Sequence, residues 1–115
     1  MSPKRRSRMA VQALVRAPVF AALGDQTRLS LVAKLCAGRP CSISQLTMGS
    51  KLTRQAITKH LRVLERVGIV HSVQAGRESL FEFDPQPMEE VRKYLDFVSL
   101  QWDQALSRLK SFVED

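Results

Sequence analysis

The sequence predicts a mainly α-helical fold with one small β-hairpin, and three observations lead to this expectation. Apolar residues recur at helical spacing in several short segments. Residues 69–84 instead have the branched and aromatic composition of two strands, with a turn at Gly76-Arg77 between them. Residues 88–113 form a single long amphipathic stretch. Two helices joined by a short turn and followed by a hairpin make a winged helix-turn-helix.

The length of 115 residues suits one domain, which we expect to span residues 9–115. Residues 1–8 are polar and basic, and are expected to be a disordered, solvated tail rather than an arm that contacts phosphates. There is no apolar run long enough for a membrane span, and the N-terminus lacks the apolar core of a signal peptide. Two cysteines do not suggest a disulfide framework. These features predict a cytoplasmic protein with reduced thiols.

The first helical pattern starts at Val11 and is expected to restart at Pro18, because proline suits the first turn of a helix. Asp25 follows a glycine and is the expected N-cap of the second helix. That helix carries an apolar stripe and should end before Gly38 and Pro40.

Ser42 or Ser44 can cap a short third helix. After a Gly-Ser turn, Thr53 is the expected N-cap of a fourth helix, residues 53–66, which Gly68 ends. The third and fourth helices form the helix-turn-helix, and residues 69–84 form its wing.

The long C-terminal helix carries more apolar surface than so small a domain can cover. It either folds back on its own core or pairs with a second subunit. We expect pairing, because Trp102 and Phe112 lie far beyond the helix-turn-helix and a monomer would expose them. The first helix is the expected companion in that homodimer interface. The expected interface residues are Leu14, Val91, Leu95, Val98, Trp102 and Leu109.

The net charge of +7 is unevenly distributed. Residues 1–77 carry fourteen Lys and Arg against two acids, Asp25 and Glu65, whereas residues 78–115 carry four against nine. The first part of the chain is therefore strongly basic and the last part acidic, which predicts one surface for a polyanion and another for a different contact. Double-stranded DNA is the expected polyanion, and a membrane surface is not expected.

The fourth helix turns polar and basic side chains outward, as a helix in a DNA major groove does. Gln suits adenine, and Arg and Lys suit guanine. Arg62, together with Arg66 and Lys51, is expected to contact phosphates, and Arg77 to enter the minor groove. His60 has two open interpretations, a DNA contact or a structural hydrogen bond at the helix–core boundary. The expected DNA-contacting residues are Thr53, Arg54, Gln55, Thr58, Lys59, His60, Arg62 and Arg77.

Two stretches together resemble the ArsR family of bacterial winged helix-turn-helix repressors: FAALGDQTRLSLVAKL, and SISQLTMGSKLTRQAITKHLRVLERVGIVHSVQAGRESLFEFD. The resemblance covers about residues 18–112 and departs at Gln26, where the family more often has proline. It implies a homodimeric transcriptional regulator, usually a repressor, on a pseudo-palindromic operator. The tail resembles a branch without recognised metal ligands, which implies autoregulation or an unknown small-molecule effector.

No cofactor or metal is expected. The family's Cys-x-Cys pair has no counterpart in residues 43–47, and the last helix holds no histidine for the family's other metal site. Cys36 and Cys41 are expected to be small buried side chains, with a thiol-based redox switch as the alternative. An enzyme is not expected, because the sequence shows no nucleophile–base pair or phosphate loop. Non-specific DNA or RNA binding is a further alternative, disfavoured because the aromatics fall in core or dimer stripes.

Overall fold

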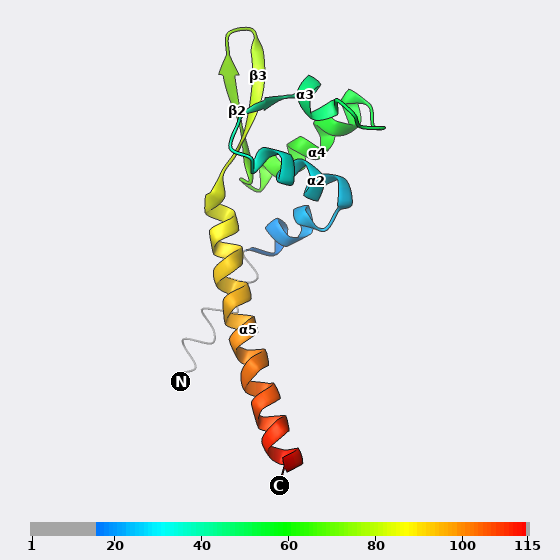
Figure 1. Cartoon of the computed structure of the whole chain (residues 1–115). Coiled ribbons are helices and arrows are strands. Elements are labelled where there is room, and N and C mark those ends of the chain that lie inside the picture. The colour runs from blue at the N-terminus through cyan, green and yellow to red at the C-terminus, as the bar shows by residue number, and fades with distance from the viewer. Residues whose placement is uncertain (1–15, 115) are drawn as a thin grey trace.

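The computed structural model describes residues 16–114, which form a globular head and one long projecting helix (Figure 1). A helical segment at residues 16–23 comes first. The elements after it are α2 (Gln26–Leu35), β1 (Cys41–Ser42), α3 (Ile43–Thr47), α4 (Arg54–Arg66), β2 (Val70–Ala75), β3 (Glu78–Phe83) and α5 (Pro85–Glu114). The predicted winged helix-turn-helix is confirmed, with α3 and α4 as its two helices and β2–β3 as its wing.

Local capping explains where the helices begin. The Asp25 carboxylate accepts a hydrogen bond from the backbone N–H of Arg28 at 3.0 Å, and the Thr53 hydroxyl accepts one from Ala56 at 3.1 Å. Of the two candidate serines, Ser42 caps α3, and Gln45 completes a reciprocal capping box. Both predicted caps, Asp25 and Thr53, are therefore confirmed.

The sheet has three antiparallel strands in the order β1-β3-β2. The wing pairs Val70 with Phe83 and Ala75 with Glu78, so that its turn falls at Gly76 with a φ of 62°. Glycine adopts that left-handed conformation without the strain that a Cβ would impose. The short β1 pairs Cys41 with Phe81 and adds a third strand to the hairpin expected from the sequence.

The core of the head lies where α2, α3 and α4 meet the base of the sheet. Helix α4 contributes one buried face, and the other helices and the sheet contribute the rest. The largest fully buried side chains are Leu31, Leu35, Leu46, Ile57, Leu61, Leu64, Ile69 and Val70. This core holds α4 against α2 and α3, and therefore fixes which face of α4 is left to solvent.

Helix α5 begins at Pro85, three residues before the expected start at residue 88. Pro85 and Pro87 occupy its first turn, where a missing N–H costs no helical hydrogen bond. The 30 residues of α5 give a length of about 45 Å. The Cα radius of gyration is accordingly 18.8 Å, against about 13 Å for a compact domain of this size. Most of α5 therefore lies outside the head.

The start of α5 is attached to the head. Val91 is buried in the core of its own chain, whereas we expect it from the sequence in the interface between two copies. Leu14, another expected interface residue, lies outside the described residues, as does the basic tail. The segment 16–23 packs beside this part of α5: the rings of Phe20 and Tyr94 are 5.7 Å apart in an edge-on arrangement. The expected restart of this segment at Pro18 is wrong, because residues 16 and 17 are already helical.

Asp84 joins the wing to α5. One carboxylate oxygen, Oδ1, accepts from the backbone N–H of Gln86 at 2.9 Å, as an N-cap does, and Oδ2 lies 2.7 Å from Nε2 of His71 on β2. The hydrogen bond from Gln86, followed by that from His71, holds the pKa of Asp84 below its usual value of 3.8.

We expect this carboxylate to contribute to stability in a pH-dependent way. Because its folded pKa lies below the unfolded one, the contribution is present above pH 3.8 and is lost as the pH falls through the folded pKa. An Asp84→Asn variant should lose less stability than the wild type between pH 4.5 and pH 3, in urea unfolding followed by circular dichroism. The matched control is Asp103→Asn, at an exposed position of α5, which should follow the wild-type curve. Parallel curves for Asp84→Asn and the wild type would contradict the assignment.

Candidate nucleic-acid interface

Helix α4 presents one outward stripe of four long side chains. Its inward face is buried through Ile57, Leu61 and Leu64. The stripe follows the opposite side at spacings of four, three and four residues, and each member is exposed. Its members are Gln55, Lys59, Arg62 and Arg66. We call this set the α4 stripe. It combines one amide and three cations, and no acid interrupts it.

The side chains on the flank of α4 nearest α3 already have partners within the chain. Arg54 donates from Nη1 to the hydroxyl oxygen of Ser44 at 2.7 Å. The hydroxyl of Thr58 donates to the backbone carbonyl of Arg54 at 2.7 Å, and that of Thr53 caps the helix. Arg54, Thr58 and Thr53 therefore lie beside the α4 stripe, and their polar atoms help to fix the start of the helix.

Two hollows border this flank. The smaller, about 210 Å³, lies between the start of α3, Arg54 of α4 and the wing residues Arg77, Glu78 and Ser79. The larger and more open one, about 580 Å³, is lined by residues of α3 and α4, including Gln55 and Lys59. Arg54 and Arg77, together with several hydroxyl side chains and Glu78, thus line the hollow between α4 and the wing. The sequence did not reveal the part played by Ser44, because nothing in the pattern marks a contact ten residues away from Arg54.

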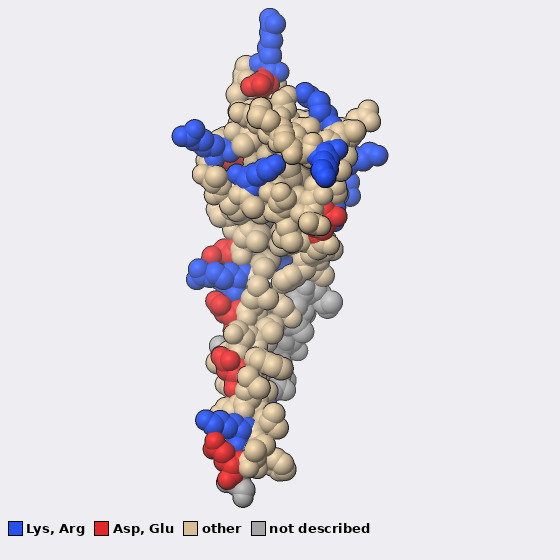
Figure 2. Space-filling view, turned by 45° about the vertical axis from the view of Figure 1, so that its right-hand side comes forward, with Lys and Arg blue, Asp and Glu red and all other residues tan. Residues whose placement is uncertain are grey.

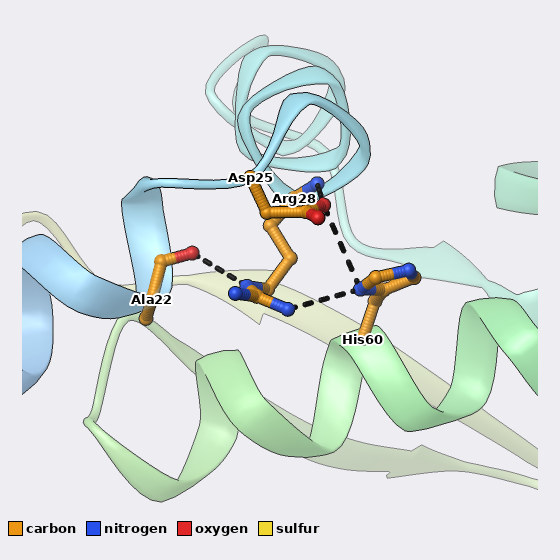
Figure 3. Close-up of polar contacts among 4 residues, drawn as sticks. All are labelled: Ala22, Asp25, Arg28 and His60. Carbon is orange, nitrogen blue, oxygen red and sulfur yellow. Dashed lines mark hydrogen bonds and ion pairs between the residues drawn. The ribbon is translucent and has the colours of Figure 1, made fainter.

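His60 lies on a different side of α4, toward α2. Its Nδ1 is 3.2 Å from Nη1 of Arg28 and 3.8 Å from Oδ2 of Asp25 (Figure 3). The imidazole is 24% exposed and makes the structural hydrogen bond that was one of its two interpretations. The hydrogen bond from the N–H of Arg28 is also the main reason that the pKa of Asp25 lies below its usual value.

The charge distribution differs between the head and the projecting helix. Figure 2 shows mainly Lys and Arg side chains over the head, whereas acidic and basic side chains alternate along α5. The only acids in residues 16–77 are Asp25 and Glu65. Asp25 caps α2, and Glu65 accepts from the Ser72 hydroxyl at 2.6 Å and lies 3.7 Å from Arg62. Because Arg62 remains 69% exposed, this pair leaves its guanidinium accessible.

The two cysteines are not the buried pair expected from the sequence. Cys36 is exposed at the C-cap of α2, and Cys41 on β1 is half-buried. The thiol of Cys41 donates to the backbone carbonyl of Arg39 at 3.4 Å. Both thiols are free. Among residues 16–114, no three His, Cys, Asp or Glu side chains are grouped so that they could hold a metal ion.

A short helix, a turn, a second helix with an outward basic face and a β-wing together define a winged helix-turn-helix of the DNA-binding kind. Residues 25–72 match the family described as "Bacterial regulatory protein, arsR family". The chain belongs to this family of helix-turn-helix transcriptional regulators, which confirms the resemblance noted in the sequence.

Relatives along most of the chain support this assignment. The uncharacterized HTH-type transcriptional regulator YuzN of Bacillus subtilis is 35% identical over 81 residues, which are 65% of this chain and 88% of that protein. The HTH-type transcriptional regulator Rv2034 of Mycobacterium tuberculosis is 29% identical over 93 residues, which are 81% of this chain and 83% of that one. Both are named as transcriptional regulators and neither as an enzyme.

The fold has solved counterparts. An ArsR-like transcriptional regulator from Rhodococcus sp. RHA1 superposes with a TM-score of 0.72 at 34% identity, over 86% of this chain and 92% of that one. In the part of the chain that the structure describes, no helix has the length and apolar character needed to cross a membrane.

Proposed function

We propose that this chain is a sequence-specific repressor, which binds a pseudo-palindromic operator as a homodimer. The helix at residues 53–66 enters the major groove, and the wing at residues 69–84 lies at the adjacent minor groove. The α4 stripe is the observation that carries the proposal. It combines an amide of the kind that can pair with adenine and three cations on the face of α4 opposite the buried one. Repression follows when a bound operator overlaps a promoter.

The proposed role of each interface residue follows from its position along α4 or beside the wing. Gln55 and Lys59, near the start of α4, are proposed to meet base edges, because the first turns of a recognition helix lie deepest in the groove. Arg62 and Arg66, farther along the stripe, are proposed to contact phosphates. Arg54 and Arg77 border the hollow between helix and wing, where they can hold the DNA backbone or, for Arg77, enter the minor groove.

The proposal of a dimer rests on the exposed apolar residues of α5. Apolar residues recur there at alternating spacings of three and four, the repeat by which two helices pair side by side. Trp102 is 64% exposed and Phe112 is 81% exposed in the single chain. The other members of this repeat beyond the head are Leu95, Val98, Ala105 and Leu109. We call these six residues the α5 seam. A second copy of the chain, whose α5 carries the same repeat, is its proposed occupant.

Selection of bound duplexes from a random library tests the proposal. At about 150 mM salt, the wild type should enrich one motif with two inverted half-sites about one helical turn apart. Placed across a promoter, the selected duplex should lower expression of a reporter when the protein is present. Enrichment of no motif, with binding that fades as salt rises, would favour non-specific binding to nucleic acid instead.

A further inference from the structure

We infer that Arg28 is a positioning residue, which ties the recognition helix α4 to the helical segment 16–23 through His60. The inference rests on the proposed reading of DNA by α4. It adds that the placement of the α4 stripe depends on a polar link to the segment that packs on α5. Arg28 and His60 are 32 residues apart in the sequence and belong to different helices.

One guanidinium makes both halves of the link. Its Nε donates to the backbone carbonyl of Ala22 at 2.6 Å, near the end of the segment 16–23 (Figure 3). Its Nη1 lies 3.2 Å from Nδ1 of His60 in the middle of α4. Arginine suits this arrangement because its planar fork holds several donors in fixed directions, whereas a lysine ammonium is a single point. The two elements are thereby held at a set distance from each other.

The hydrogen bond runs from Arg28 to His60. Arginine has donors and no acceptor, so Nδ1 of His60 accepts. Asp25 accepts from the N–H of Arg28 at 3.0 Å, while its Oδ2 is 3.8 Å from His60, beyond hydrogen-bonding distance. Asp25 therefore caps the start of α2, and among residues 16–114 the hydrogen bond to His60 comes from Arg28.

The other end of the link reaches α5. Within the segment 16–23, Val19 and Ala22 are buried, and Phe20 contacts Tyr94 of α5 through their rings. Arg16 also lies 3.9 Å from Glu90 of α5. A continuous series of contacts therefore runs from α5 through this segment and Arg28 to His60. On α4, His60 directly follows Lys59 of the α4 stripe. Loss of the hydrogen bond between Arg28 and His60 therefore shifts the surface that we propose to meet DNA.

The test compares substitutions at both ends of the link. Arg28→Lys keeps the charge but cannot serve Ala22 and His60 together, and His60→Ala removes the acceptor. Each should bind the duplex selected by the wild type about tenfold more weakly, the size of effect expected for one charge-assisted hydrogen bond. Binding to an unrelated duplex should not change. His60→Asn should restore binding to within about twofold, because its carbonyl oxygen stands as far from Cβ as Nδ1 does.

Controls separate positioning from loss of the fold. Arg39→Lys makes the same chemical change at an exposed loop position and should bind like the wild type. The double variant Arg28→Lys/His60→Ala should be no weaker than the weaker single variant, because both remove one link. All binding is measured well below each variant's unfolding midpoint.

Several results would overturn the inference. These are wild-type affinity in both single variants, equal losses for the selected and unrelated duplexes, or a double variant whose loss is the product of the two single losses. If the wild type selects no motif, the proposed function itself is wrong. If the wild type selects a motif and the variants bind it with wild-type affinity, only the role of Arg28 is wrong.

Discussion

A Trp102→Glu variant is expected to be monomeric and to bind the selected duplex at least about 100-fold more weakly than the wild type. Trp102 lies in the middle of the α5 seam and is 64% exposed in the single chain. In the proposed dimer each copy buries one such indole, and large aromatic residues at the centre of an interface commonly contribute more than 2 kcal/mol each. Glutamate removes that contribution twice and places two like charges in an apolar contact.

The loss of DNA binding follows from the loss of the dimer. Two joined heads bind two half-sites with a high effective concentration, whereas a single head has only its own contacts. Sedimentation equilibrium measures the dimer, and fluorescence anisotropy with the selected duplex measures the binding. A single half-site should bind the variant and the wild-type monomer equally, because the head is unchanged.

Leu100→Glu is the matched control. Leu100 is 54% exposed on the same helix, but it falls outside the α5 seam. The Leu100→Glu substitution makes the same apolar-to-acidic change, and the dissociation constant of the dimer should stay within a few-fold of the wild-type value. A Trp102→Glu protein that stays dimeric, or equal effects of the two substitutions, would show that the α5 seam is not the interface.

The parts of the fold that depend on local interactions were predictable from the sequence. The sequence marks Asp25 and Thr53 as caps because a capping side chain bonds within three residues of itself. Gly76 marked the wing turn, since few other residues adopt its backbone conformation readily. The buried face of α4 followed from helical periodicity alone.

The parts that depend on contacts between distant segments were not predictable in the same way. Strand β1 has two residues, too few for an alternating pattern, and it forms only because β3 pairs with it. Cysteine is a residue type that is commonly buried, yet Cys36 is exposed at the end of α2. Val91 belongs by periodicity to the long apolar stripe of α5, but the head covers it. One apolar stripe can thus pack against the head near the start of a helix and remain exposed farther along the same helix.

In the candidate site, too, local features were predictable and contacts between distant residues were not. The outward face of α4 was predictable, because it is the complement of the buried face. The partners of individual side chains were not, since Arg54 bonds to Ser44 and His60 to Arg28 across the fold. On the α4 stripe, Gln55 and Lys59 are the residues nearest the start of the helix, and we propose that they read bases.

Replacing Gln55 with alanine is expected to relax the sequence preference at one position in each half-site. A glutamine amide can donate and accept at the edge of adenine, and such a pair discriminates against other bases by about 1–3 kcal/mol. Because a dimer contains two copies, the affinity for the selected duplex should fall by twice that free energy, while the affinity for an unrelated duplex changes little. Selection repeated with the variant should yield a motif degenerate at two symmetric positions.

Arg66→Ala is the control for this experiment, because Arg66 belongs to the α4 stripe but is proposed to contact phosphate. It should weaken binding to all sequences alike and reduce the slope of log affinity against log salt by about 1 for each subunit. The two variants therefore differ in kind as well as in size: one changes the motif, the other the salt dependence. An unchanged motif with Gln55→Ala would place base reading elsewhere on the head, with Lys59 the next residue to replace.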